Sequence, residues 1–248
     1  MCIRDRSFTY TGTGTTTYGP SATAPTNAGT YSVAGTISNP NYTGSGSGTL
    51  TISPATATVT IGSQTQTYTG SAIPATATTA PTGISVSFIY TGTGTTTYPA
   101  SSTAPTNAGT YSVTASIKSA AGGLSANYTG TATQAMTIAP ATATVALTTG
   151  THTYTGSAIS ATATTTPTGL SVTYSYTGTG TTTYPTSSTA PTNAGSYTVV
   201  GTVSNPNYTG SSTGTLTISP ATATVTIGSQ TQTYTGSPIS ATATTRCV

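Results

Sequence analysis

Internal repetition is the feature that most constrains what this chain can fold into. The hexapeptide Pro-Ala-Thr-Ala-Thr-Val begins at Pro54, Pro140 and Pro220, which gives spacings of 86 and 80 residues. The segment from Gly48 to Ser71 returns letter for letter from Gly214 to Ser237. A period of this length is typical of an array of small domains built on one plan. The fold of one repeat therefore predicts the fold of the chain.

The repeat boundaries divide the chain into four repeat segments and two short ends. We expect the C-terminal part of one repeat at 7–53, complete repeats at 54–139 and 140–219, and the N-terminal part of another at 220–245. The first complete repeat is six residues longer than the second, and the extra residues lie between Lys118 and Ala126. The Gly122-Gly123 pair there predicts a lengthened loop.

The two ends match nothing else in the chain. Residues 1–6 begin Met-Cys-Ile-Arg-Asp, and residues 246–248 are Arg-Cys-Val. Both are reading frames of AGATGTGTATAAGAGACAG, which resembles a transposon-end adapter used in preparing sequencing libraries. We therefore interpret 1–6 and 246–248 as adapter read-through, and such segments are left out of fold reasoning. Both cysteines lie in them, so no disulfide is expected from the cysteine count.

The remaining composition is almost free of charge. Without the three arginines and one aspartate of the two ends, the formal net charge falls from +3 to +1. Only Lys118 and His152 are left, and no acidic residue remains. Phosphate neutralisation needs clustered cations, so we expect no nucleic-acid partner. No apolar run approaches the roughly 20 residues of a membrane-spanning helix, and we expect no membrane contact by this fragment.

Apolar residues within a repeat alternate with Thr and Ser. This period of two predicts half-buried strands, and no stretch has a helical period. One predicted strand face carries Ala57, Val59 and Ile61, a second Ile84 to Tyr90, and a third Tyr111 to Ile117. Turn residues separate the strands, as in Pro-Thr-Gly and Asn-Pro-Asn-Tyr-Thr-Gly. The predicted fold class is all-β, with each repeat an immunoglobulin-like β-sandwich.

The most specific local motif is Asn-Ala-Gly-Thr/Ser-Tyr. It places a tyrosine at the start of a predicted strand three times: Tyr31, Tyr111 and Tyr197. The pattern is similar to the tyrosine corner of immunoglobulin-like domains, in which the tyrosine stands two residues before the second cysteine. Val113 occupies that cysteine position in the first complete repeat. We expect a sandwich held together by packing alone.

The ordered set of motifs resembles a known family. Tyr-Thr-Gly-Ser, Pro-Thr-Asn-Ala-Gly-Thr/Ser-Tyr, Asn-Tyr-Thr-Gly and a closing Thr-Ile-x-Pro follow one another in each repeat. In this order they resemble the MBG-type and related bacterial immunoglobulin-like repeats of large surface adhesins. The resemblance covers the whole chain between the two ends and implies an extracellular or cell-surface location. Some relatives are closer to a β-grasp fold, which is the alternative architecture.

Catalytic and metal chemistry lack the residues that they need. General acid-base and nucleophilic catalysis require a positioned base and a group that orients it. The repeats contain no Asp, Glu or Cys, and the other copies carry Gln66 and Gln232 where one has His152. Zinc and calcium sites need clustered His, Cys or carboxylate ligands. We expect no catalytic residue, no metal site, no cofactor and no enzyme activity.

Asparagine and lysine residues offer two other kinds of site. Asn41, Asn127 and Asn207 each open Asn-Tyr-Thr, a formal glycosylation acceptor, and the alternative interpretation is a turn. A Lys-Asn isopeptide bond would need a lysine and an acidic helper in each domain, but Lys118 stands alone in the insertion loop. We interpret it as a solvated loop lysine.

Two functional classes remain open. In the first, the repeats are a structural spacer or stalk of a bacterial surface or secreted adhesin-like protein, in contact only with neighbouring repeats. Host or surface glycans would then be bound through a separate tip domain. In the second, the repeats themselves bind carbohydrate or a cell-surface partner, and Tyr98 and Tyr184 are the candidate binding residues. Exposed aromatic rings beside amide side chains at the same place in both complete repeats would favour the second class.

Overall fold

A computed structural model describes residues 6–62, 64–118 and 123–247. The regular elements of these residues are strands, apart from one short 3-10 turn, η1, at Leu124–Asn127. This confirms the all-β prediction. The chain separates into two compact units, Met1–Ala139 and Pro140–Val248, which are described one at a time.

The first unit begins with an antiparallel sheet of three strands in the order β1-β2-β3. Their bounds are β1 Arg6–Gly12, β2 Gly29–Ile37 and β3 Ser45–Ile52. Arg6, which belongs to the segment interpreted as adapter read-through, lies in β1 and pairs with Ile37. These strands correspond to β8, β9 and β11 of the complete repeat that follows.

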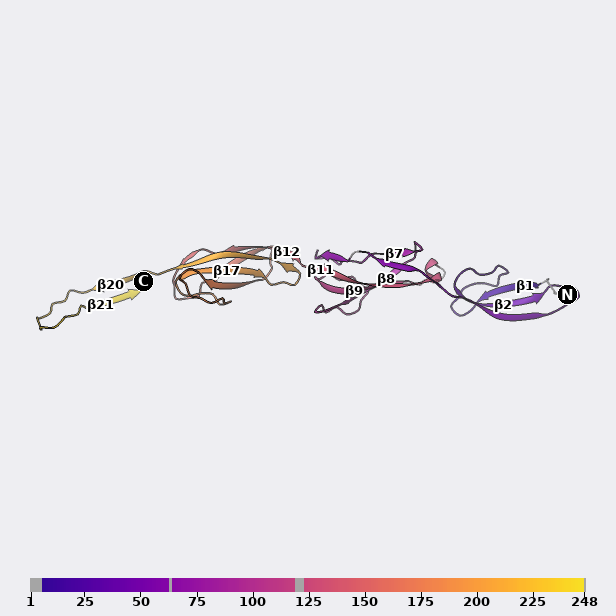
Figure 1. The fold of residues 1–248 in the computed structure, drawn as a ribbon, viewed down its shortest axis with the longest axis horizontal. Helices are drawn as coiled ribbons and strands as arrows, with labels where there is room; N and C mark the ends of the chain where they lie inside the picture. The colour runs from indigo at the N-terminus through magenta and orange to yellow at the C-terminus, as the bar shows by residue number, and fades with distance from the viewer. Residues whose placement is uncertain (1–5, 63, 119–122, 248) are drawn as a thin grey trace. The chain divides into compact units, whose positions relative to one another are not determined.

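The first complete repeat follows in the same unit and forms two facing layers (Figure 1). One layer is the four-stranded sheet β6-β11-β9-β8, and the other is the antiparallel pair β5-β7. Strand β6 runs parallel to β11, whereas the β11-β9 and β9-β8 pairs are antiparallel. A short parallel pair, β4-β10, completes the repeat. The strand bounds are β4 Ala55–Thr56, β5 Thr58–Ile61, β6 Thr65–Thr67, β7 Ala77–Ala80, β8 Val86–Gly92, β9 Gly109–Ile117, β10 Tyr128–Thr129 and β11 Thr131–Ala139.

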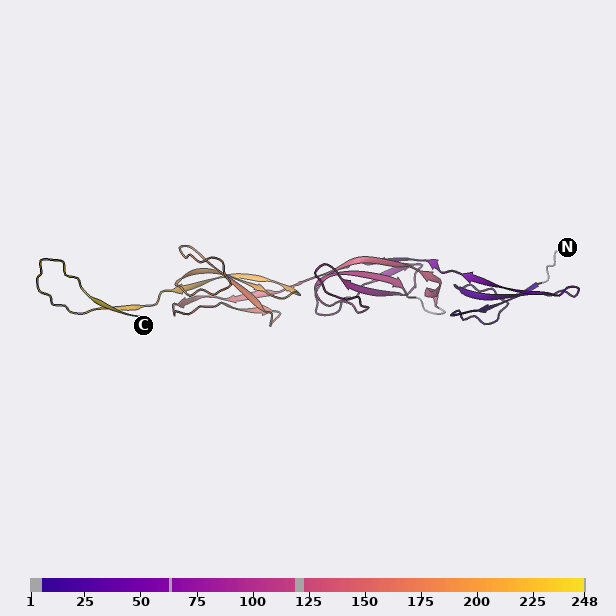
Figure 2. The same cartoon turned by 90° about the horizontal axis from the view of Figure 1, so that it is seen from below.

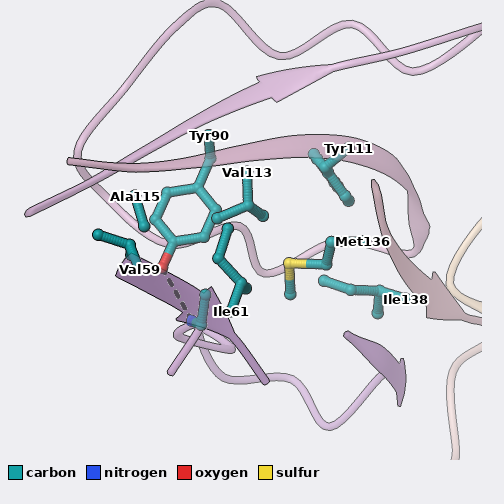
Figure 3. Packing of buried hydrophobic residues seen from close by; sticks show 9 residues of the cluster. Val59, Ile61, Tyr90, Tyr111, Val113, Ala115, Met136 and Ile138 are labelled. Atoms are coloured by element: carbon teal, nitrogen blue, oxygen red, sulfur yellow. Dashed lines mark hydrogen bonds between the residues drawn. The ribbon is translucent and has the colours of Figure 1, made fainter. Parts of the chain in front are cut away.

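The core of this repeat lies between the two layers. Side chains from β5 face those of β8, β9 and β11, because every second residue of a strand points to the same face. Figure 3 shows Val59 and Ile61 opposite Tyr90, Val113 and Met136. The backbone N–H of Ala75 donates to the Tyr90 hydroxyl at 2.9 Å, so the polar end of this buried ring is satisfied. The apolar residues that alternate with Thr and Ser in the sequence therefore form the core of this repeat.

The second unit repeats the same plan (Figure 2). The four-stranded sheet is β14-β19-β17-β16, the facing pair is β13-β15, and the short parallel pair is β12-β18. A two-stranded antiparallel hairpin, β20-β21, contains the last described residues. The strand bounds are β12 Ala141–Thr142, β13 Thr144–Thr148, β14 Thr151–Thr153, β15 Thr162–Thr166, β16 Val172–Gly178, β17 Gly195–Val203, β18 Tyr208–Thr209, β19 Ser211–Ser219, β20 Ala223–Ile227 and β21 Ala243–Cys247.

The two-layer arrangement identifies each complete repeat as an immunoglobulin-like β-sandwich. In the β-grasp alternative a helix would cover the sheet, whereas in the described residues a second strand pair takes this place. The 3-10 turn η1 is the one departure from an entirely extended repeat. It arises in the insertion, where Leu-Ser-Ala-Asn has no β-branched residue and the Ala126 N–H donates to the Gly123 carbonyl at 3.0 Å.

Candidate functional site

The three tyrosines of the Asn-Ala-Gly-x-Tyr motif are buried at the start of equivalent strands. Each hydroxyl donates to the backbone carbonyl of the asparagine four residues earlier. The O···O distances are 2.6 Å for Tyr31 to Asn27, 2.7 Å for Tyr111 to Asn107 and 2.7 Å for Tyr197 to Asn193. This is the hydrogen bond that defines a tyrosine corner. It ties the turn to the strand that follows, so the motif has a structural role.

The candidate sugar-binding residues, Tyr98 and Tyr184, lie against these corner tyrosines. The ring of Tyr98 meets that of Tyr111 edge-on at 5.6 Å between centroids, and Tyr184 meets Tyr197 in the same way at 5.5 Å. Both rings are half-buried against the core. The structure thus brings together two sets of tyrosines that the sequence analysis treated separately.

The hydroxyls of Tyr98 and Tyr184 are already engaged. They donate to the backbone carbonyls of Thr103 at 2.9 Å and Thr189 at 2.8 Å. A bound sugar would therefore meet the exposed part of each ring rather than a free hydroxyl. Burial raises the pKa of Tyr111 above its ordinary value, and the neighbouring Tyr98 raises it further. The pKa of Tyr197 is raised by burial and by Tyr184 in the same way.

Sequence reasoning did not include Tyr18, the third member of this set. Tyr18 contacts Tyr31 edge-on at 5.6 Å, and its hydroxyl donates to the Thr23 carbonyl at 2.8 Å. The signal was present, because Thr-Thr-Thr-Tyr precedes the corner motif in all three copies. The arrangement of paired tyrosines is a property of every copy.

A tight loop holds each outer tyrosine in place. In the first complete repeat the Gly92 N–H donates to the Tyr98 carbonyl at 2.8 Å, and Thr96 N–H donates to the Thr93 carbonyl at 3.0 Å. A side chain at Gly92 would collide with the Thr96 carbonyl, and Gly94 has a positive φ of 61°. Both positions need glycine for these reasons. The Thr-Gly-Thr-Gly repeat is explained by this loop geometry.

A shallow groove recurs beside the tyrosine pairs. In the first unit it has a volume of about 530 Å³ and is also lined by Gly123 and Ala126 of the following repeat, and in the second unit a groove over the corresponding tyrosine and asparagine has about 560 Å³. Hydroxyl, amide and aromatic groups line both grooves. The shared lining residues are Thr16, Tyr18 and Asn27 in the first and Thr182, Tyr184 and Asn193 in the second. This surface places an aromatic ring beside an amide side chain at the same place in two repeats.

The glycosylation-type asparagines differ in exposure. Asn41 is exposed, whereas Asn127 and Asn207 are half-buried. The backbone N–H groups of Asn41 and Asn207 donate to the side-chain oxygens of Asn39 at 2.9 Å and Asn205 at 2.8 Å. These bonds form Asx turns, in which an asparagine side chain imitates a backbone turn. The turn interpretation therefore describes these two positions.

The remaining polar candidates are single exposed residues. His152 is exposed in β14, and Lys118 is exposed after β9. No group of three or more His, Cys, Asp or Glu side chains lies together among the described residues. In the same part of the chain, no helix is long and apolar enough to cross a membrane.

Fold and repetition together define a class, a tandem array of immunoglobulin-like β-sandwich repeats. Within that class, the chain belongs to the MBG domain family, which matches residues 5–56, 57–142, 143–222 and 223–248. This confirms the resemblance drawn from the motifs. Repeats of this kind are generally non-catalytic and are typical of extracellular or surface proteins.

No curated protein sequence matches the chain. Among solved structures, the chain is similar to "Sidekick-1 immunoglobulin domains 1-5", with 13% sequence identity and a TM-score of 0.30. The match covers 87% of this chain and 52% of that one, so this chain spans about half the length of the solved chain.

Proposed function

We propose that the chain is a structural spacer, a stalk segment of a bacterial cell-surface or secreted adhesin-like protein. The observation that carries this proposal is the shortness of the connections between repeats. Strand β3 ends at Ile52 and β4 begins at Ala55, while β11 ends at Ala139 and β12 begins at Ala141. The strands of successive repeats are separated by Ser53-Pro54, by Pro140 and, before β20, by Pro220-Ala221-Thr222.

The chemistry of these connections supports the spacer. Proline fixes its own φ and restricts the residue before it to extended conformations. A linker of one to three residues that contains a proline restricts how a repeat can move relative to the next. Each complete repeat also has its own buried core, so the array can be lengthened by duplication without a new core. Semi-rigid units in series are what a protein needs in order to hold a distant domain away from a surface.

Small-angle X-ray scattering on the full chain tests the spacer proposal. Cys2 and Cys247 are replaced by serine so that no disulfide joins two copies. A compact globule of this length has a radius of gyration of about 18 Å. We expect a value well above this, with the circular dichroism of a folded β protein. A folded chain with a radius near 18 Å would refute the spacer.

A second candidate function is carbohydrate binding by the repeats themselves. The recurring groove supports it, because hydroxyl, amide and aromatic groups are those that recognise sugars, and they recur beside Tyr18 and Tyr184. Tyr98 is the counterpart in the first complete repeat. A glycan array with the same full chain is the test. A reproducible hit that Tyr98→Ala and Tyr184→Ala weaken, and Tyr98→Phe and Tyr184→Phe retain, would establish this function. A blank array would eliminate it.

A further inference from the structure

The side chain of Asn127 reaches out of its own repeat into the preceding one. Its Oδ1 accepts a hydrogen bond from the backbone N–H of Ala28 at 2.7 Å. Its Nδ2 donates to the side-chain Oδ1 of Asn27 at 3.0 Å. Asn127 opens Asn-Tyr-Thr-Gly in one repeat, and Asn27-Ala28 belongs to the Asn-Ala-Gly motif of the other. Two motifs 100 residues apart therefore meet through one amide group.

The chemistry of the two contacts selects asparagine. A backbone N–H can only donate, so the Asn127 atom that faces Ala28 is the carbonyl oxygen and the other atom is the amide nitrogen. The same side chain must accept at one atom and donate at the other. Aspartate would lack the donor, and alanine would lack both groups. Only an amide makes both bonds in this place.

Asn127 is held firmly on its own repeat. It is the last residue of η1, and the following Tyr128–Thr129 strand pairs with β4. The turn itself is anchored because the buried hydroxyl of Ser125 accepts from the Ser85 N–H at 3.1 Å. Hydrogen bonds therefore hold the elements that precede and follow Asn127, and these elements fix the position of its amide group.

The receiving turn is equally well supported. The Asn27 carbonyl accepts from the Tyr31 hydroxyl, and the Thr30 N–H donates to Thr16 Oγ1 at 3.0 Å. A Cβ at Gly29 would lie 2.7 Å from the Thr16 methyl carbon, so the turn packs closely against the neighbouring loop. The Ala28 N–H and the Asn27 side chain are thereby fixed for a partner.

We propose that this turn is a docking site for the next repeat, in which the asparagine of Asn-Tyr-Thr-Gly sets the orientation of one repeat on another. Asn41 occupies the same place in the motif but is exposed, whereas the docked Asn127 is half-buried. The exposure of the asparagine therefore distinguishes the docked position from the undocked one. The proposal also removes Asn127 from the glycosylation candidates, because its amide nitrogen is occupied. It applies to a passive spacer and to a sugar-binding array alike.

Distance measurements between spin labels test the docking. In the full chain, with Cys2 and Cys247 replaced by serine, cysteines are introduced at the exposed positions Thr49 in β3 and Thr78 in β7. Double electron-electron resonance then reports how widely the distance between the two repeats varies. We expect a narrow distribution in the parent. Asn127→Ala should raise the undocked fraction on the order of tenfold and broaden the distribution.

Two further variants separate docking from folding. Asn41→Ala removes the equivalent asparagine of the other repeat and should leave the distribution unchanged. Asn27→Ala leaves η1 and β10 untouched, removes one of the two bonds and should broaden the distribution less than Asn127→Ala. The docking is refuted if Asn127→Ala and Asn27→Ala both keep the parental width while amide exchange shows folded repeats. Equal broadening by Asn41→Ala would refute it as well. Neither result depends on the radius of gyration or on the glycan array.

Discussion

The two complete repeats share a strand plan but fill their interiors differently. In the first, nine buried residues form one continuous cluster around Val113 and Met136. In the second, the buried residues form two clusters, one around Val199 and Leu216 and the other around Val145. The same sheets therefore enclose one core in one repeat and a divided core in the other.

A pair of coupled substitutions explains part of this difference. The first repeat has Ile61 and Ala115 where the second has Leu147 and Gly201. A Cβ at Gly201 would lie 2.8 Å from a methyl carbon of Leu147, so the γ-branched leucine occupies the space that an alanine methyl group would need. Leucine and isoleucine contain the same number of carbon atoms, and they differ in where the side chain branches. Branching and the presence of the alanine methyl group therefore change together, because closely packed interiors leave no room for overlap.

The largest expected effects come from truncating the centre of each core. Met136→Ala and Leu216→Ala each remove a side chain that is at most 1% exposed and should cost about 2–5 kcal/mol of stability. Because the cores are separate, the loss should be confined to the repeat that carries the substitution. Native-state amide exchange, followed peptide by peptide, measures this. Ala135→Ser, at an exposed neighbour of Met136, is the control, and equal loss of protection in both repeats would contradict independent cores.

A smaller effect is expected from substitutions that give the second repeat the core residues of the first. Gly201→Ala places a methyl group against Leu147 and should destabilise the second repeat by about 1–3 kcal/mol. The double variant with Leu147→Ile recreates the pair of the first repeat and should recover most of this loss. Chemical denaturation of all four members of the cycle gives the coupling energy. Strict additivity would show that the two positions do not compensate.

The tyrosine corner should respond equally in both repeats. Tyr111→Phe and Tyr197→Phe keep the ring but remove the hydroxyl that donates to the Asn107 or Asn193 carbonyl. We expect a loss of about 1 kcal/mol in each, the net contribution of one hydrogen bond. Tyr234→Phe, at a hydroxyl on a ring that is 90% exposed, is the matched control. An effect in one repeat alone would show that the motif is not equivalent in the two.

Much of the fold could be predicted because its signals are local. Alternation placed Val59 and Val113 in the core, and the Asn-Ala-Gly-x-Tyr spacing located Tyr111 and Tyr197 at the start of strands. The turn at Leu124–Asn127 was missed because it lies in an insertion that has no counterpart in the other repeats. A single turn of 3-10 helix also carries no periodic pattern.

The candidate site was harder to predict because its contacts do not follow the alternation of a strand. The Tyr98 hydroxyl bonds to a backbone carbonyl five residues away, and its ring packs on Tyr111, neither of which alternation reveals. The contact between Asn127 and Asn27 joins different repeats and depends on how they dock. The sequence showed both motifs three times but contained no sign that one receives the other.

The smallest effect concerns pH, and the two repeats should behave alike. Burial raises the pKa of Tyr111 and Tyr197 in the folded state, so folding favours the neutral phenol. This contribution is fully present below the ordinary tyrosine pKa of about 10 and is lost as the pH rises through the higher folded value. With Cys2 and Cys247 replaced by serine, the chain has few ionisable side chains besides its tyrosines and basic groups, namely one acidic residue and one histidine. Denaturation midpoints should therefore be flat between about pH 5 and 9 and fall above about pH 10. The Tyr111→Phe and Tyr197→Phe double variant should show a shallower alkaline decline, whereas an unchanged decline would assign it to the other tyrosines.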